Sequence, residues 1–177
     1  MKKIGCDAYY SSPHKWLMAP AGNGILYIKE DMINDVWTTL ASSQWNNHED
    51  NGYRLGQRGT GNPALLIGFE AALDLHFDIG PERVYKRIKE LGDQLRQGLR
   101  QVKGSEIVTS IHPEMCSGLT TFKVDGVEDK VLQDELWKRG KIQPRALRDN
   151  KGVRYSTHIY NSEDEIERTL EIINEIN

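Results

Sequence analysis

In the second half of the chain, apolar residues recur at helical spacing in three segments. The first runs from residue 81 to Gly104 and repeats an apolar residue every three or four positions. The second covers residues 127–139, with a glycine just past its end. The third opens at Ser162, which is spaced from Glu165 as in a capping box. These patterns predict three helices, of which the first is long and amphipathic.

Strand-like patterns lie between the predicted helices. Residues 106–111 and 119–124 each read as a strand, and residues 141–147 and 153–157 are two further strand candidates. The order of helix, two strands, helix, two short strands and helix is typical of a compact α+β domain. We therefore expect residues 80–177 to form one small α+β domain.

The first half of the chain has a different pattern. Residues 4–10 and 24–28 read as strands, and the nearly continuous apolar run of the second strand suggests burial on both faces. Asn62, as N-cap before a proline, opens a helix that is apolar nearly all round over residues 64–77, so we expect it to be buried. Two strands and one helix cannot cover their own faces. This region therefore borrows a partner or belongs to a larger fold of the α/β class.

Residues 31–61 form a long polar stretch with scattered apolar residues. Such a stretch is usually functional or disordered. Trp37 and Trp45 argue against simple disorder, because tryptophans contribute most when they are buried or lie at an interface. We expect this stretch to lie at an interface with another chain.

Composition and charge exclude several classes of protein. The formal net charge is −3, which gives no reason to expect a nucleic acid or an anionic membrane as partner, and no apolar run approaches the length of a membrane helix. The first residues lack the apolar core of a signal peptide, and Cys6 and Cys116 form no CxxC motif. We therefore expect a cytoplasmic protein with reduced cysteines. The histidines show no ligand spacing, so no metal site is predicted.

A lysine stands in a tight turn between the two strands of the first half. Residues 11–16 read Ser-Ser-Pro-His-Lys-Trp, and Gly22-Asn23-Gly24 precedes the second strand. A lysine on a turn is usually a solvated surface residue. A lysine held between buried strands can instead lose its proton and act as a nucleophile. The local pattern alone leaves both interpretations open.

Three segments together resemble the class V aminotransferase family, which includes cysteine desulfurases and isopenicillin N epimerase-like proteins. Residues 6–17 followed by 22–27 are similar to the family's pyridoxal-phosphate lysine region. Residues 58–63, Arg-Gly-Thr-Gly-Asn-Pro, resemble its GT-x-N segment, and residues 153–161 with the glutamates after them resemble its closing segment. The resemblance covers essentially the whole chain but only the carboxyl-terminal half of the family. It implies an α/β fold type I pyridoxal-phosphate transferase fragment.

The resemblance assigns roles to residues of the lysine turn. Lys15 is implied to be the Schiff-base lysine, which forms an imine with pyridoxal 5'-phosphate and moves the α-proton of an amino acid substrate. Ser12 and His14 match positions that hold the cofactor phosphate. Gly59 and Thr60 match a segment that reaches the phosphate of the neighbouring subunit, so the resemblance implies a homodimer.

Arg154 matches the arginine that binds the substrate carboxylate, where a planar bidentate donor is needed. In the strand expected over residues 153–157, Arg154 and Ser156 share one face and their neighbours share the other. This alternation predicts that Arg154 faces a cleft while the adjacent side chains face a core.

The sequence also departs from the family. The aspartate that pairs with the pyridine nitrogen, the group that stacks on the ring and further phosphate ligands belong to family segments that precede the matched region. A desulfurase needs a cysteine on the loop before the arginine, but residues 143–151 contain none. We therefore expect an aminotransferase or an epimerase- or lyase-like enzyme, and disfavour a desulfurase that carries its cysteine on this loop.

These observations predict two domains and leave more than one function open. Residues 1–79 are expected to be the end of the cofactor-binding large domain, with its sheet, and residues 80–177 the complete carboxyl-terminal α+β domain. The alternative to an enzyme half is a catalytically inactive truncated remnant that folds and self-associates without turnover. A third possibility is an anion-binding module that uses a basic run of residues, which we interpret chiefly as a solvated face around a carboxylate site. This run comprises Lys138, Arg139, Lys141, Arg145, Arg148, Lys151 and Arg154.

Overall fold

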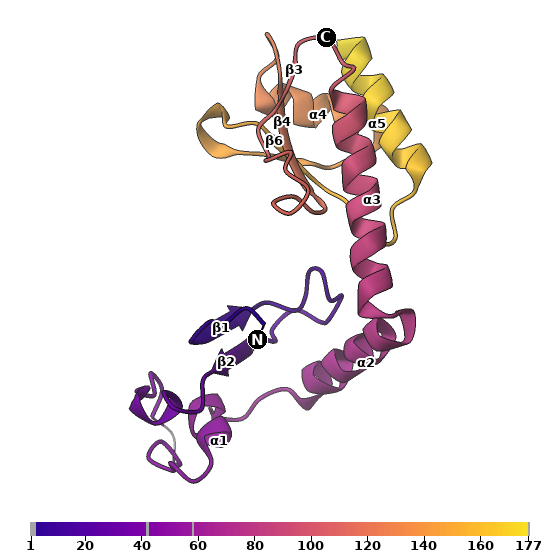
Figure 1. Ribbon diagram of the computed structural model, residues 1–177. Helices are drawn as coiled ribbons and strands as arrows, with labels where there is room; N and C mark the ends of the chain where they lie inside the picture. The colour runs from indigo at the N-terminus through magenta and orange to yellow at the C-terminus, as the bar shows by residue number, and fades with distance from the viewer. Residues whose placement is uncertain (1–2, 42, 58, 177) are drawn as a thin grey trace. The chain divides into compact units, whose positions relative to one another are not determined.

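The computed structural model describes residues 3–41, 43–57 and 59–176 and divides the chain into two compact units (Figure 1). Unit 1 comprises residues 1–78 and unit 2 residues 79–177. The described part of each unit contains one antiparallel sheet, with two strands in unit 1 and four in unit 2. Among the described residues, none of the helices combines the length and apolar composition that crossing a membrane requires.

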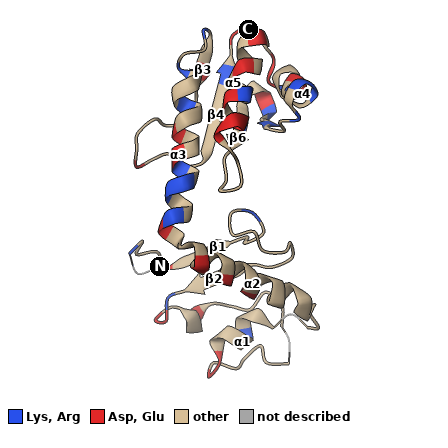
Figure 2. Cartoon of the chain, turned by 90° about the vertical axis from the view of Figure 1, so that its right-hand side faces the viewer, with Lys and Arg blue, Asp and Glu red and all other residues tan. Residues whose placement is uncertain are grey.

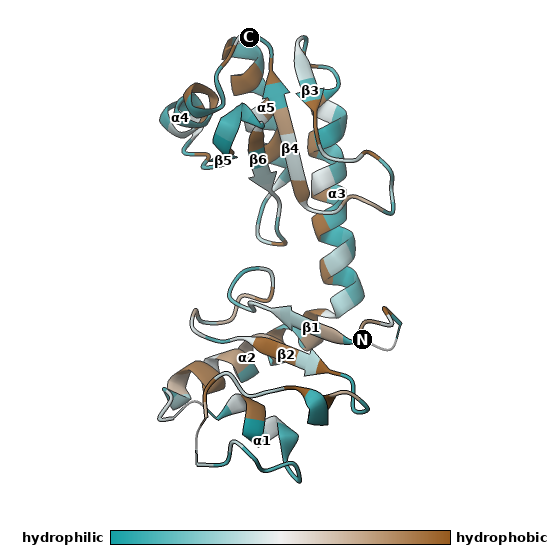
Figure 3. Cartoon of the chain, turned by 90° about the vertical axis from the view of Figure 1, so that its left-hand side faces the viewer, coloured by the Kyte–Doolittle hydropathy of each residue, from teal (hydrophilic) through white to brown (hydrophobic). Residues whose placement is uncertain are grey.

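Unit 2 is an α+β domain with helices on one face of its sheet. The strands lie in the order β3-β4-β6-β5, and every neighbouring pair is antiparallel. In Figure 3 these strands lie in front of α3 and α5. The elements are α3 (Pro81–Leu99), β3 (Ser105–Ile107), β4 (Leu119–Val124), α4 (Asp129–Gly140), β5 (Arg145–Ala146), a 3-10 turn (Arg148–Asn150), β6 (Val153–Ser156) and α5 (Glu163–Ile176).

The core of unit 2 lies between this sheet and its helices. Phe122 on β4 and Val153 on β6 are fully buried, and they belong to one apolar cluster with residues of α3, α4 and α5. The amphipathic spacing of α3 explains its contribution, because its buried residues recur every three or four positions. Figure 2 shows residues of both signs of charge along α3 and α5.

Local signals begin and end several elements as the sequence predicts. The amide of Glu165 donates to the Ser162 hydroxyl, and the amide of Ser162 donates to the Glu165 carboxylate, which completes the capping box of α5. Asn62 caps α2 (Pro63–Ile79), because its side chain accepts a hydrogen bond of 3.0 Å from the amide of Ala64.

Three predicted boundaries are wrong in unit 2. Helix α3 ends at Leu99, and the residues up to Gly104 form turns, although Val102 still packs in the core. The strand expected over residues 106–111 is limited to β3, and that over 141–147 to β5. Both are edge strands, so each pairs with only one neighbour in the sheet. Beyond β3 the amides of Val108 and Thr109 both donate to the carbonyl of Thr121, which interrupts the regular ladder.

Unit 1 is built from a small hairpin, two short helical turns and one long helix. Among the residues that the structure describes, strands β1 (Ala8–Ser11) and β2 (Ile25–Ile28) pair only with each other. The polar stretch that follows contains a 3-10 turn (Ile33–Asp35) and helix α1 (Asn51–Gly56), and helix α2 ends the unit. The buried guanidinium group of Arg54 donates to the carbonyl oxygens of Ile33 and Val36, which ties α1 to that turn.

The expected burial of unit 1 is wrong for both its helix and its second strand. Helix α2 forms as predicted, but Ala72 is the single buried residue among those described in it, and Leu66 is 65% exposed. Strand β2 has no buried residue, and Leu26 is exposed. Figure 3 shows the hydrophobic colour along both elements. The physical reason is that the described residues of unit 1 supply no second layer to cover these faces.

Candidate functional site

The lysine turn begins where β1 ends and is held by its own backbone. The amide of Ala19 donates to the carbonyl of Pro13 at 3.2 Å, and the amide of Met18 donates to that of Lys15 at 3.1 Å. Pro13 is buried within this turn, whereas Ser12, His14 and Lys15 are exposed. The structure therefore places a hydroxyl, an imidazole and an amine within four residues on a closed turn, with their side chains available to a ligand.

Helix α2 supports the base of this loop. The Asn23 side chain donates to the carbonyl of Leu65 at 2.7 Å, so the Gly-Asn-Gly segment is bound to the first turn of the helix. A Cβ atom on Gly68 would lie only 2.5 Å from Cγ of Pro20, so a glycine is required where the loop crosses the helix. The sequence analysis did not predict this contact, although Gly68 inside an apolar helix is a signal of close packing.

The second predicted phosphate segment lies just before α2. Gly59 has a positive φ of 98° and is exposed, as is Thr60. Arg58, which begins the motif in the sequence, lies outside the described residues. Gly59 and Thr60 therefore occupy a different segment of unit 1 from the lysine turn, and the structure does not group them with it.

Arg154 belongs to unit 2, on the central strand β6. Val153 and Tyr155 are buried, whereas Arg154 is half-buried and Ser156 is exposed, so the predicted alternation of faces is confirmed. Arg154 pairs directly with Thr121 of β4 and faces away from the core. Nε of Arg154 is buried and has no hydrogen-bond partner within residues 3–41, 43–57 and 59–176. The described residues therefore leave this donor without an acceptor.

A buried carboxylate holds the chain that leads into β6. Oδ2 of Asp129, at the start of α4, accepts a hydrogen bond of 2.6 Å from the amide of Gly152. Gly152 has a φ of 113°, and a Cβ atom there would lie 2.9 Å from the carbonyl oxygen of Phe122. The side chain of Asn150 also accepts a bond from the amide of Asp129. These contacts fix the backbone two residues before Arg154.

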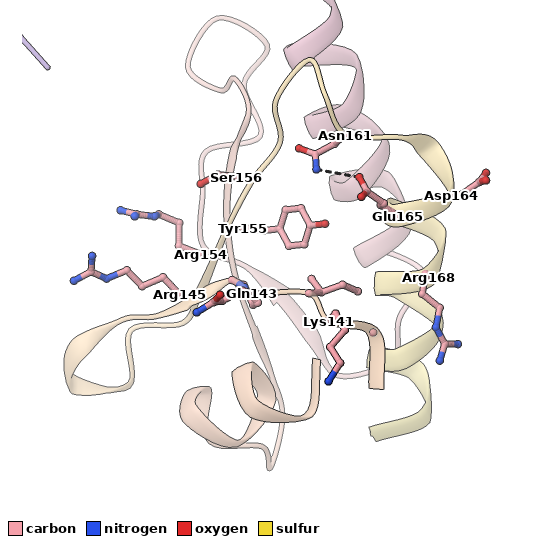
Figure 4. Close-up of a pocket in the computed structure, with 13 residues that line it drawn as sticks. Lys141, Gln143, Arg145, Arg154, Tyr155, Ser156, Asn161, Asp164, Glu165 and Arg168 are labelled. Carbon is pink, nitrogen blue, oxygen red and sulfur yellow. Dashed lines mark hydrogen bonds between the residues drawn. The ribbon is translucent and has the colours of Figure 1, made fainter. Parts of the chain in front are cut away.

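A second arginine stands directly opposite Arg154. Arg145 of β5 is its register partner in the β5–β6 ladder, so the two side chains emerge on the same face of the sheet. Figure 4 shows both guanidinium groups side by side, on the opposite side of the strand from Tyr155. The sequence analysis named Arg145 only as part of a basic run. Its place beside Arg154 depends on the cross-strand register, which the sequence did not define.

A pocket of about 520 Å³ adjoins these two strands within unit 2 (Figure 4). Arg145, Arg154 and Tyr155 line it from the sheet, and residues at the start of α5 line it from the other side. Burial raises the pKa of the Tyr155 hydroxyl. The hydrogen bond from the Asn161 side chain lowers the pKa of Glu165, with a further contribution from the amide of Ser162. The pocket is thus lined by two arginines from the sheet and by Asp164, Glu165 and Arg168 from α5.

Other candidate chemistry is sparse in the described part of the chain. Within residues 3–41, 43–57 and 59–176, no group of histidine, cysteine and carboxylate side chains is arranged to hold a metal ion. Cys116 is buried in the connection between β3 and β4, away in sequence from the loop that precedes Arg154. The acid–base and nucleophilic candidates are therefore those of the lysine turn.

Comparison with protein families gives one match over most of the chain. The model of the family described as aminotransferase class-V matches residues 1–169. Isopenicillin N epimerase of Amycolatopsis lactamdurans is 32% identical over 98% of this chain and 48% of its own. A probable hercynylcysteine sulfoxide lyase of Mycobacterium tuberculosis is 26% identical, over 96% of this chain and 45% of its own. The chain spans about half the length of the curated relatives it matches.

Solved structures share the fold. The apo cysteine desulfurase of Thermococcus onnurineus has a TM-score of 0.88 and 24% identity, and covers 99% of this chain with 48% of its own. A mutant of C-DES with glycine covalently linked to its PLP cofactor has a TM-score of 0.86 and 26% identity, over 98% of this chain and 47% of its own.

Proposed function

The chain belongs to the class V aminotransferase family and has the fold of type I pyridoxal-phosphate enzymes, and from that premise we propose its role. It is the part of a pyridoxal 5'-phosphate enzyme that supplies the cofactor lysine, Lys15, and the carboxylate-binding arginine, Arg154. The observation that carries this proposal is the closed turn on which Ser12, His14 and Lys15 are all exposed.

The donor set of the turn fits the cofactor. Pyridoxal phosphate, when bound, supplies an aldehyde for an amine and a ring that withdraws electrons from the substrate. The Lys15 amine can bind that aldehyde and accept or return a proton at the substrate α-carbon. The Ser12 hydroxyl and the His14 ring can donate hydrogen bonds to the phosphate. Gly59 and Thr60 can bind the phosphate of the cofactor in a neighbouring subunit.

Arg154 fits the substrate. Its guanidinium group can hold a carboxylate with two parallel hydrogen bonds, and its unpaired Nε is a donor of the required kind. The hydrogen bond from Gly152 to Asp129 and the burial of its neighbours on β6 hold the backbone of Arg154 in place. Binding by Arg154 would orient an amino acid by its carboxylate.

We infer an aminotransferase or an epimerase- or lyase-like reaction. Curated relatives named as an epimerase and a sulfoxide lyase support this range. Residues 143–151 carry no cysteine, and Cys116 is buried in another connection, so a desulfurase that uses a cysteine on the loop before Arg154 is disfavoured. Relatives also include cysteine desulfurases, so this exclusion rests on the sequence of that loop alone.

The exposed apolar side chains of unit 1 support association with a second copy. Trp37 is 77% exposed and Trp45 also reaches the surface, with their ring centroids 5.8 Å apart, and α2 exposes further apolar residues. Aromatic side chains of this kind are typical of interface centres. A homodimer would cover them and would bring Gly59 and Thr60 to the neighbouring site. The same surface would also serve an inactive remnant that only self-associates.

Reductive trapping of the cofactor on a lysine distinguishes the proposed enzyme from a catalytically inactive remnant. Protein expressed from the complete reading frame is incubated with pyridoxal phosphate, reduced with borohydride and digested, and the peptides are weighed. We expect the cofactor mass on the Lys15 peptide and not on the Lys29 peptide, because Lys29 is bound to Asp7. An unmodified Lys15 peptide, or equal labelling of both lysines, contradicts the proposal and favours the remnant.

A further inference from the structure

The second arginine of the open face has no role in the function proposed so far. The open face is the side of the unit 2 sheet that carries Thr121, Lys123, Arg154, Ser156 and Arg145. On it, Thr121, Arg154 and Arg145 form one row across β4, β6 and β5, because each is the direct register partner of the next. Directly opposed residues have Cα atoms about 4.5–5.5 Å apart. Two guanidinium groups therefore stand next to each other with a neutral hydroxyl on the far side of Arg154.

The neighbouring guanidinium groups of Arg145 and Arg154 repel each other unless an anion binds to them. Like charges placed directly opposite each other destabilise a strand pair. Neither Arg145 nor Arg154 has an acidic partner among the described residues. Four other arginines of unit 2 are each paired with a carboxylate, Arg87 with Glu163, Arg96 with Asp93, Arg139 with Glu135 and Arg168 with Glu171. Arg83, Arg100 and Arg148 have no ion pair among the described residues, but neither do they lie opposite another arginine in the sheet. The fold thus leaves unpaired the two guanidinium groups that lie together.

We infer that Arg145 binds a second anionic group of the substrate, so that the substrate is an amino acid with a further carboxylate. This rests on the proposed function, in which Arg154 takes the α-carboxylate. One guanidinium group saturates one carboxylate through two parallel bonds, so the neighbouring group is left for a second acid. Because Thr121 is neutral, the second acid lies on the β5 side of Arg154. Arg145 is therefore a residue that determines specificity.

The two arginines also border the same pocket. Arg145 and Arg154 both line the cavity of about 520 Å³, which is large enough for a small dicarboxylic amino acid. The acidic residues of that pocket, Asp164 and Glu165, come from α5, and Figure 4 shows Glu165 on the other side of Tyr155 from the guanidinium groups. Arg168 also lines the pocket from α5, so that side carries both signs of charge, whereas the sheet side carries the two arginines.

Matched pairs of ligands test this assignment. Protein expressed from the complete reading frame and labelled with ¹⁵N is titrated with L-glutamate and L-glutamine, and with L-aspartate and L-asparagine, while the arginine Nε–H signals are followed. Each pair differs only in the charge of one group. Of glutamate and aspartate, we expect the one that binds more tightly to have about tenfold higher affinity than its own amide. A hydrogen bond between charged groups adds about this much affinity.

Four substitutions, at three arginines, locate the effect. Arg145→Gln should abolish the preference for the acid and leave the affinity for the amide within about twofold, whereas Arg145→Lys, which keeps the charge, should retain part of the preference. Arg154→Gln should weaken all four ligands. Arg148→Gln removes the same charge from an exposed position in the same connection. It should change neither the preference for the acid nor the affinity for any ligand. Unchanged amide signals of Phe122 and Val153 verify the fold of each variant.

The outcomes separate this inference from the proposed function. Equal affinities for acid and amide in the parent chain, including no saturable shift with any ligand, overturn the inference. So does an equal loss for acid and amide in Arg145→Gln. If Arg154→Gln leaves all affinities unchanged, the carboxylate role within the proposed function fails as well. If Arg154→Gln weakens all ligands but Arg145→Gln alters no preference, only the inference fails.

Discussion

Unit 2 encloses a continuous core of buried side chains, whereas unit 1 leaves most of its apolar side chains at the surface. Helix α3 carries its buried residues on one stripe and covers the unit 2 sheet with it. Helix α2 is apolar on nearly all sides, yet it buries only Ala72 among its described residues. The two helices are adjacent in sequence and similar in length, but they differ in how many of their apolar side chains are buried.

The difference separates what local sequence determines from what a partner layer determines. Capping residues and apolar spacing are sufficient to begin and continue both helices. Burial requires a second layer, and unit 2 supplies one from its own residues. In unit 1 the equivalent surface stays open, which is why we propose that a second copy covers it.

The largest expected effect comes from removing one large apolar side chain from each unit. Phe122→Ala should lower the free energy of unfolding by about 3–5 kcal/mol, because Phe122 is fully buried and a cavity would remain. Leu66→Ala, at an exposed position of α2, should change it by less than about 0.5 kcal/mol. Urea unfolding followed by circular dichroism measures both. Equal losses in the two variants would show that α2 is buried after all.

A smaller effect is expected at the contact that leads into β6. Asp129→Ala leaves the amide of Gly152 without its acceptor, which should cost about 1–3 kcal/mol. Asp134→Ala, which removes an exposed carboxylate from the same helix, should have little effect. The same unfolding experiment applies. If Asp129→Ala is as mild as its control, the carboxylate does not hold the backbone before Arg154.

The smallest effect concerns the ion pair between α5 and α3. The guanidinium group of Arg87 lowers the pKa of Glu163 from its usual 4.5 to about 2. A lowered pKa means that the ion pair stabilises the fold above about pH 4.5 and loses this contribution as the pH falls through about 2.

The melting temperature of Glu163→Gln measured against pH therefore tests this pair. We expect the variant to melt slightly below the parent chain at pH 6 and to match it near pH 2. Glu167→Gln, which removes an exposed carboxylate from the same helix, should show a smaller pH-dependent difference. A difference between Glu163→Gln and the parent that persists at pH 2 would exclude the ion pair as its cause.

Most of the elements could be predicted from the sequence, because their signals are local. The capping box of Ser162 and Glu165 and the cap at Asn62 lie where they were expected. The alternation on β6 also placed Arg154 on the face opposite Val153. The burial of α2 could not be predicted, because it depends on residues that would have to cover it.

The candidate site was predictable only where it is local. Ser12, His14 and Lys15 occupy one turn, so their proximity follows from their spacing. The approach of Arg145 to Arg154 depends on the register of β5, a strand of two residues whose pattern is too short to read. The hydrogen bond between Asp129 and Gly152 spans two elements and has no local signal.

Hydrogen exchange of the 177-residue chain tests the contrast between the units most directly. Backbone amides in closed, well-packed elements exchange only when the whole core opens, whereas those of poorly covered elements exchange through local opening. We predict that the amides of α3, β4, β6 and α5 are protected orders of magnitude more strongly than those of β1, β2 and α2. Equal protection of α2 and α3 in the monomeric chain would contradict the account.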